Sequence, residues 1–353
     1  MDGDVVHQMT TRIRRLLTLP RSPLTSIVVL GVLGVMPLLA ACSGEALATE
    51  VRANGQTVGA PASLTQPAPG PAAAAAPRRS TGLVPPPSGI APKQVVPVAP
   101  PNITARSAIV IDDATGAILF ERNGRTRIPP ASLTKIATAA RAIDKGKLDD
   151  WVEVTSDFME PALDDASMMG LKKGDRFKLR DLIFGMLLPS GADASITIGR
   201  AISGSDAAFV KDLNAFMESL GLFDTHFIDA HGLGGPTHLS TAYDIAMLSR
   251  YALRQPLFAE VARAQSYEAV GSRTLEVYNT NPWAFGYEGG DGVKSGFTEE
   301  AGPTLSASAT RGGHRVIVVV LDSTMRNPDT TALMDWAFNS FCWADGQLGC
   351  RAR

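Results

Sequence analysis

The chain has 353 residues, with 33 lysine and arginine side chains against 35 aspartate and glutamate side chains and a formal net charge of −2. This length allows two or three domains, so composition along the chain must indicate how much of it folds. The balanced charge lacks the basic excess of a nucleic-acid-binding surface, which excludes nucleic acid as a partner. None of the five histidines lies beside a cysteine pair at zinc-ligand spacing, so we expect no metal and no cofactor.

The first 41 residues have the features of a secretory signal peptide. Several arginines precede an apolar run from Ile27 to Ala41, and this run is shorter than the roughly 20 residues of a membrane-spanning helix. It ends in Leu-Ala-Ala-Cys at residues 39–42, which resembles a bacterial lipobox. We therefore expect cleavage before Cys42, lipidation of its thiol and an extracytoplasmic, lipid-anchored protein. The alternative is a plain signal peptide followed by an incidental cysteine.

Composition changes twice after this segment. Residues 42–102 are rich in alanine, proline and glycine and hold half of the 24 prolines, so we interpret them as a disordered tether. A folded catalytic domain is predicted for residues 103–345, followed by a tail at 346–353. Outside the cytoplasm, Cys342 and Cys350 favour a structural disulfide, with free thiols as the alternative.

The predicted folded domain reads as strands, then helices, then strands. Proline residues precede the first helix, where proline is accepted, and apolar residues recur in it at helical spacing. Two strands at one end and three at the other suggest a single sheet assembled from both ends of the domain. The predicted elements are a hairpin at 108–120, helices at 131–144, 179–188, 192–202, 206–220 and 242–253, strands at 292–297, 304–310 and 316–321, and a last helix at about 330–341.

Three short segments carry residues suited to acyl-transfer chemistry. Ser132 and Lys135 are three residues apart at a helix N-terminus, which places both side chains on one face. A lysine acts as a base only when its amine is neutral, which requires desolvation or a neighbouring positive charge to lower its pKa, and a second lysine nearby would do that. Lys294 is the candidate, on a strand followed by Ser295 and Gly296, and Ser190 lies at a turn that ends an apolar helix.

In the order SxxK, SGA and KSG, the three segments resemble the motif set of the penicillin-recognising serine enzymes. Within that group the chain looks most like the D-alanyl-D-alanine carboxypeptidases of peptidase family S11. The likeness runs from about Ser107 to Phe341, and the segments that carry it are 130–138 (PASLTKIAT), 174–195, 209–222, 231–233 (HGL), 279–281 (NTN) and 289–302.

The resemblance implies an α+β fold, an α/β/α sandwich of the β-lactamase/transpeptidase type. Its five-stranded antiparallel sheet is flanked by helices and accompanied by a helical subdomain. The implied activity is serine acyl transfer on the D-Ala-D-Ala end of a peptidoglycan stem pentapeptide. β-Lactams are implied as inhibitors that acylate the same serine.

The resemblance also assigns roles to residues. Ser132 would be the nucleophile, Lys135 its base, and Ser190 the relay of a proton to the leaving amine. Lys294 and Ser295 would bind the substrate carboxylate. The backbone N–H groups of Ser132 and of Phe297, just after Gly296, would form the oxyanion hole.

Two positions depart from the family pattern. Ser295 replaces a threonine and keeps the hydroxyl, whereas Ala192 stands where the family usually has an asparagine that contacts substrate and the active-site lysine. The loss of that amide leaves open a catalytically weak or silent peptidoglycan-binding lipoprotein. A D,D-endopeptidase would use the same residues, and sequence does not separate it from a carboxypeptidase.

We interpret His231 as structural. Arg326, at the start of the last helix, could help to hold a substrate carboxylate, but we interpret it as a solvated surface residue. A class A β-lactamase would need a glutamate in an ExxLN motif for deacylation. The nearest match here is VKDLN at residues 210–214, with Val210 in place of the acid.

Overall fold

The computed structural model describes residues 89–159 and 163–343. The predicted signal peptide, Cys42, most of the predicted tether and the predicted tail at 346–353 lie outside the described residues. Within the described part, no helix combines the length and the apolar character needed to cross a bilayer.

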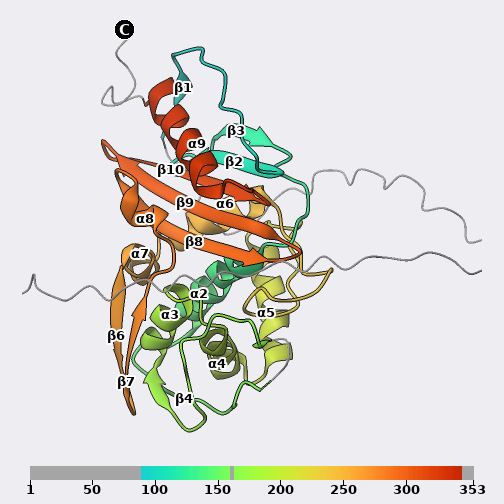
Figure 1. The fold of residues 1–353 in the computed structure, drawn as a ribbon, viewed down its shortest axis with the longest axis vertical. Coiled ribbons are helices and arrows are strands. Elements are labelled where there is room, and N and C mark those ends of the chain that lie inside the picture. The colour runs from blue at the N-terminus through green and yellow to red at the C-terminus, as the bar shows by residue number, and fades with distance from the viewer. Residues whose placement is uncertain (1–88, 160–162, 344–353) are drawn as a thin grey trace, which may run out of the picture. The chain divides into compact units, whose positions relative to one another are not determined.

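A five-stranded antiparallel sheet forms the centre of the domain, as predicted (Figure 1). Its strand order is β3-β2-β10-β9-β8, so strands from both ends of the domain meet at the β2–β10 pair. The strands are β2 (Ser107–Asp112), β3 (Ile118–Arg122), β8 (Gly290–Thr298), β9 (Gly302–Arg311) and β10 (His314–Leu321).

Both faces of the sheet are buried, which explains the uninterrupted apolar runs in its central strands. In β10, Ile317 and Val319 pack in one hydrophobic core, while Val316 and Val318 pack in the other. Successive residues of a strand point to opposite faces, so one short segment contributes to both cores. The resulting layers are helix, sheet and helix, which confirms the predicted sandwich.

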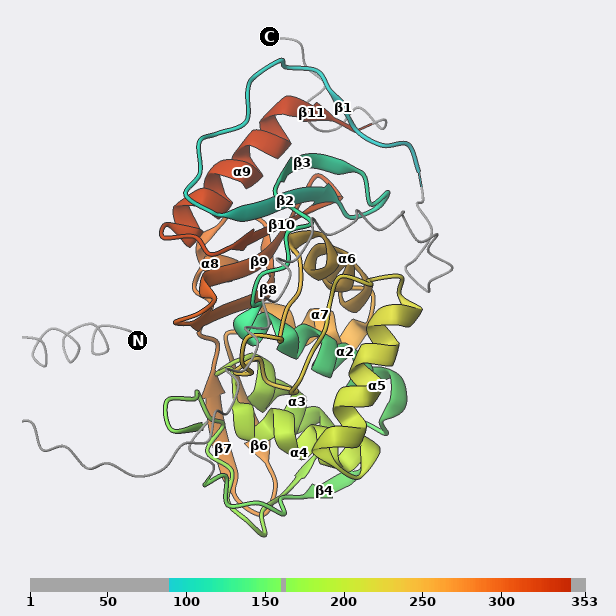
Figure 2. The ribbon, with the colours of Figure 1, turned by 90° about the vertical axis from the view of Figure 1, so that its right-hand side faces the viewer.

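Helices cover the two faces of the sheet. Helix α9 (Arg326–Ser340) packs on β9 and β10 in one core, together with the short helix α8 (Trp283–Gly286). Helices α6 (Ala242–Ala252) and α7 (Pro256–Arg263) lie against the other face (Figure 2). Proline at the first position of α7 suits a helix start.

The helical subdomain is inserted between the two groups of strands. Helix α2 (Thr134–Lys145) connects it to the sheet, because α2 packs against α3, α4 and α5 on one side and α6 on the other. The other helices are α3 (Leu179–Leu187), α4 (Ala192–Ser203) and α5 (Asp206–Ser219), and the outlying strands are β4 (Trp151–Glu153), β5 (Arg176–Lys178), β6 (Ser266–Val270) and β7 (Thr274–Tyr278).

The ordered domain begins earlier than the predicted boundary at residue 103. Residues Lys93–Gln94, which we assigned to the tether, form β1 and pair with β11 (Phe341–Cys342). The indole N–H of Trp336 also donates to the Val98 carbonyl. Backbone pairing therefore orders a stretch whose composition alone indicates disorder. Cys342 is disulfide-bonded, while Cys350 lies outside the described residues.

Candidate active site

Ser132 sits in a short 3₁₀ turn, η2 (Ala131–Leu133), that leads directly into α2. The sequence predicted a single helix from 131, and the tighter first turn is the difference. Ala131 has a positive φ of 51°, which is uncommon for a residue with a Cβ and is characteristic of functional sites. Ser132 is buried, with 9% of its surface exposed.

Lys135 lies one helical turn after Ser132 and faces it. Its Nζ is 3.1 Å from Ser132 Oγ and 2.7 Å from the carbonyl oxygen of His231. Burial lowers the pKa of Lys135 to about 7, and the charges of Asp229 and Asp193 partly oppose this shift. Near neutral pH a substantial fraction of this amine is therefore uncharged and able to accept a proton.

Of the two causes that the sequence left open, desolvation and a neighbouring positive charge, desolvation of the Lys135 amine is the largest in the structure. The second lysine, which we favoured as the source of that charge, is not among the groups that shift the pKa of Lys135. The helix and the loop that cover the amine come from segments far apart in the sequence, so its burial is not visible in the SxxK pattern.

Ser190 approaches Ser132 from the end of helix α3. Its Oγ donates to Ser132 Oγ at 2.9 Å, and its φ of 68° is again in the left-handed region. Gly191 is required next, because an added Cβ would lie 2.5 Å from the Gly185 carbonyl oxygen and 2.8 Å from Met169 N. The turn after helix α3 is therefore strained at Ser190, and it places the Ser190 hydroxyl within hydrogen-bond distance of the Ser132 hydroxyl.

Lys294, Ser295 and Gly296 reach the site on strand β8. A Cβ added at Gly296 would lie 2.9 Å from Ser132 N and 2.7 Å from Thr304 Oγ1, so β8 runs directly against η2. Lys294 is 2% exposed, and its Nζ donates to the Ser295 carbonyl. Burial, followed by the charges of Lys135 and Arg326, holds the pKa of Lys294 well below its usual range.

Arg326 was wrongly set aside as a solvated residue. It begins helix α9, and its Nη1 donates to the Gly296 carbonyl at 3.1 Å. Partial burial lowers the pKa of its guanidinium. Neither Lys294 nor Arg326 forms an ion pair with any residue the structure describes. No motif surrounds Arg326 in the sequence, and only the fold brings it to β8.

The HGL segment lies directly on the SxxK turn. Gly232 has a φ of 90°, and a Cβ there would meet the Ala131 carbonyl oxygen at 1.9 Å. His231 contributes its backbone carbonyl to Lys135, while burial lowers the pKa of its imidazole to about 4. A neutral, largely covered imidazole agrees with the structural role that we predicted for this histidine.

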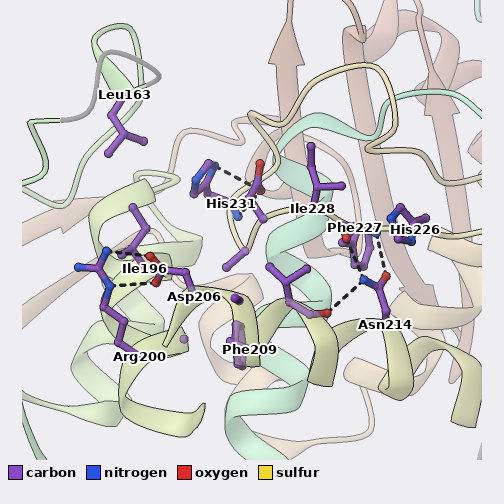
Figure 3. Close-up of a pocket in the computed structure, with 15 residues that line it drawn as sticks. Leu163, Ile196, Arg200, Asp206, Phe209, Asn214, His226, Phe227, Ile228 and His231 are labelled. Carbon is purple, nitrogen blue, oxygen red and sulfur yellow. Dashed lines mark hydrogen bonds and ion pairs between the residues drawn. The ribbon is translucent and has the colours of Figure 1, made fainter. Parts of the chain in front are cut away.

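A cavity of about 560 Å³ adjoins the site behind the HGL segment. Figure 3 shows His231 and Ile228 on one wall, above Phe209 of α5, with the Arg200–Asp206 ion pair at one end. Ser132, Lys135 and Ser190 are not among its lining residues. The cavity therefore shares a wall with the candidate active site without containing its reactive atoms.

Ala192 occupies the position where the resemblance predicts an asparagine. Its side chain is buried with 1% exposed, and its N–H donates to the Ser167 carbonyl. The next residue, Asp193, is fully buried and accepts hydrogen bonds from the N–H groups of Met169, Gly170 and Leu171. Position 192 thus contributes apolar packing, and Lys135 takes its oxygen partners from Ser132 and His231.

Comparisons with solved structures define the class of this fold. The domain resembles the crystal structure of the Streptomyces K15 DD-transpeptidase with a TM-score of 0.64 and 31% sequence identity, covering 68% of this chain and 98% of that one. Segments carrying Ser132, Ser190 and Lys294 meet within this shared architecture. The fold is therefore that of the DD-peptidases.

The particular family follows from the sequence comparisons. The D-alanyl-D-alanine carboxypeptidase family model, peptidase S11, matches residues 94–325, and the chain belongs to this family. It is 35% identical over 251 residues to D-alanyl-D-alanine carboxypeptidase DacF of Bacillus subtilis (strain 168), covering 67% of this chain and 63% of that protein. It is 38% identical over 254 residues to DacD of Escherichia coli (strain K12), covering 69% of this chain and 65% of that protein. The match thus spans slightly less than two thirds of these relatives' own lengths.

The close approach of Gly296 to Ser132 yields a prediction. Replacing Gly296 with alanine forces β8 away from the Ser132 N–H, and we expect acylation of Ser132 by a labelled penicillin to slow by about 100-fold or more, as displacements of about 1 Å do in active sites. The second-order rate of adduct formation measures the effect. Gly286→Ala is the matched control, because no heavy atom lies within 4 Å of its added Cβ. An unchanged acylation rate in a folded Gly296→Ala variant would contradict the view that acylation of Ser132 depends on the close approach of β8.

Proposed function

We propose that this protein is a serine-type D-Ala-D-Ala carboxypeptidase that acts on peptidoglycan stem peptides through an acyl-enzyme on Ser132. One observation carries the proposal. The Ser132 hydroxyl lies between a second hydroxyl, that of Ser190 at 2.9 Å, and a buried amine, that of Lys135 at 3.1 Å. Because its pKa is about 7, this amine is a base at physiological pH.

In the proposed acylation, Ser132 Oγ attacks the carbonyl carbon of the penultimate D-alanine, and its proton passes to Lys135 Nζ. The tetrahedral intermediate then collapses as the C–N bond breaks, and Ser190 relays a proton to the leaving amine. Free D-alanine departs, leaving an ester on Ser132. Water attacks this ester in the second half of the reaction, which restores the serine and releases the shortened peptide. None of these reaction steps requires a cofactor.

The oxyanion that forms in both steps needs donors in place before the reaction. We assign this role to the backbone N–H groups of Ser132 and Phe297. The proximity of Gly296 to Ser132 N supports this pairing, because it places β8 and η2 on the two sides of one small space. Each such donor typically contributes about 3 to 4 kcal/mol to transition-state stabilisation.

The terminal carboxylate of the substrate would be bound by the cationic groups along β8. Neither Lys294 nor Arg326 has an ion-pair partner among the described residues, and burial, followed by the charges of Lys135 and Arg326, keeps the pKa of Lys294 low. A carboxylate beside them would offset that repulsion and favour the charged ammonium. We add Arg326 to the predicted binding residues Lys294 and Ser295.

Of the three alternatives, a D,D-endopeptidase would use the same residues, while a class A β-lactamase and a silent binding protein fit this site less well. In α5, Asn214 of the partial ExxLN match makes hydrogen bonds to the backbone of Val210 and Phe227 rather than facing Ser132. With Val210 in place of the acid, we expect a penicilloyl adduct to turn over slowly. A silent binding protein would have no need for the buried amine and the two strained residues, Ala131 and Ser190.

Loss of the nucleophile tests the activity directly. We expect the protein to release D-alanine from diacetyl-L-lysyl-D-alanyl-D-alanine and Ser132→Ala to slow this release at least about 1,000-fold. Free D-alanine is measured with a coupled oxidase assay. Ser219→Ala is the control, because its hydroxyl bonds only within its own helix. Release that survives in Ser132→Ala would point to another nucleophile, and no release by the native protein would support the binding function.

The extracytoplasmic location of this reaction motivates a second proposal, that Cys42 carries a lipid anchor. The support is the Leu-Ala-Ala-Cys sequence at the end of the apolar run. A single acyl chain binds membranes only marginally, whereas several chains on one cysteine give stable anchoring. The part of the predicted tether (residues 42–102) that precedes strand β1 would then link the lipid to the enzyme.

Replacing Cys42 with serine tests the anchor. In cells that express the full chain, we expect the native protein in the membrane fraction and in the detergent phase of a Triton X-114 partition, and the Cys42→Ser variant in neither. Ser43→Ala is the matched control and should stay with the membrane. Intact mass spectrometry should show a diacylglyceryl group on the native protein, and its absence from membrane-bound protein would exclude lipidation.

A further inference from the structure

The segment 229–232 contains a carboxylate that the mechanism above does not use. Asp229 Oδ1 accepts hydrogen bonds from the backbone N–H groups of His231 at 2.8 Å and Gly232 at 2.6 Å. The side chain is 17% exposed. These two bonds fold the chain into a tight turn, and the turn presents the His231 carbonyl to Lys135 Nζ at 2.7 Å.

A second network fixes the same segment to the SxxK turn. The Ile228 N–H donates to Nδ1 of His238, which leaves the proton on Nε2. Nε2 lies 2.8 Å from Thr134 Oγ1, and that hydroxyl donates to the Ala131 carbonyl. Asp229 therefore belongs to a segment held rigidly against the residues on either side of Ser132.

We propose that Asp229 is a positioning residue of the acyl-transfer site. It folds the turn that holds the Lys135 amine, and its negative charge sets the pH range in which that amine works as a base. The inference deepens the proposed function and rests on it for its kinetic readout, although the titration of Lys135 can be measured whether or not the protein releases D-alanine.

The charges around Lys135 single out Asp229. Asp229 raises the pKa of Lys135 against the larger effect of burial, and Asp193 on α4 acts in the same direction. Asp193 is fully enclosed by the backbone N–H groups that it binds, so it has a separate structural role.

The remaining titratable groups near the amine are two histidines and one lysine. Burial lowers the pKa of His231 to about 4 and also lowers that of His238. Lys294 approaches from β8, with Arg326 behind it, and its pKa is lowered too. With a pKa of about 4, the imidazole of His231 adds no charge change in the range where Lys135 titrates. Asp229 is therefore the carboxylate whose removal we test.

The test removes the charge and keeps the hydrogen bonds. In Asp229→Asn, the amide oxygen can still accept from His231 N and Gly232 N, so the turn should persist. Without the negative charge, the pKa of Lys135 should fall by on the order of one unit. Activity requires the neutral amine, so the acidic limb of kcat/KM for D-alanine release should move to lower pH by the same amount. At pH 6 the variant should retain roughly five times more of its own plateau rate than the native enzyme retains.

Asp206→Asn provides the matched control. It makes the same chemical change on the wall of the same cavity, where Asp206 pairs with Arg200 at 2.8 Å. Its carboxylate is not among the charges that shift Lys135, so the acidic limb should not move. Asp229→Ala removes charge and hydrogen bonds together, and we expect it to lower kcat as well as shift the limb.

Two outcomes overturn the inference. One is an acidic limb in Asp229→Asn that stays within error of the native value or moves to higher pH. The other is a shift of equal size in Asp206→Asn. If Asp229→Asn does not fold, Asp229→Ser carries the same prediction, because its hydroxyl can accept the same backbone N–H groups. If the native protein releases no D-alanine, the proposed function fails by itself, and NMR titration of the Lys135 side chain in native protein and variant still decides the role of Asp229.

Discussion

The burial of one lysine amine against one serine hydroxyl is the constraint on which the rest of this structure depends. Removing an ammonium from water is unfavourable, and a shift of the Lys135 pKa from 10.5 to about 7 corresponds to several kcal/mol. The surrounding fold must supply that energy. In the proposed mechanism, Ser132 thereby has a base that is partly neutral at physiological pH.

The fold meets this constraint by bringing four separate segments to one point. Helix α2 supplies Lys135, the end of α3 supplies Ser190, and strand β8 supplies Lys294. The segment at 229–232 closes the remaining side with a carbonyl oxygen. Two glycines make the contacts possible, because Gly296 and Gly232 lie where a Cβ would meet the backbone of Ser132 or Ala131. Where these segments meet, Ser132, Lys135, Ser190 and Lys294 are all buried.

Sequence reasoning predicted much of the fold because the patterns were local. The apolar runs of β9 and β10 and the apolar spacing of α2 to α6 gave the sheet and the helices to within a few residues. Helix α9 began four residues earlier than predicted, at Arg326, because Pro328 lies in its first turn, where a missing N–H is harmless. The small strand β1 was missed because its order comes from pairing with the distant β11.

The same contrast between local motifs and tertiary contacts explains which residues of the candidate site could be predicted. Ser132, Lys135, Ser190 and Lys294 could be picked out because they lie in short motifs with recognisable order. Arg326 was considered as a carboxylate ligand and set aside, and Asp229 was not identified, because each reaches the site only through tertiary contacts. Arg326 contacts the Gly296 carbonyl, and Asp229 lies in the turn beneath Lys135. Of the two causes of a low lysine pKa that the sequence left open, we favoured the neighbouring lysine, because desolvation depends on every covering segment and is not visible in one motif.

The most direct test of the account is the protonation of Lys135 itself. In protein labelled with ¹³C at the lysine side chains, the Lys135 Cε signal can be followed from pH 5 to 11 and assigned by its absence in Lys135→Met, with Lys294→Met separating the second buried lysine. We predict a titration midpoint near 7 for Lys135. A midpoint near the ordinary value of about 10.4 would leave Ser132 without a base and would contradict the mechanism.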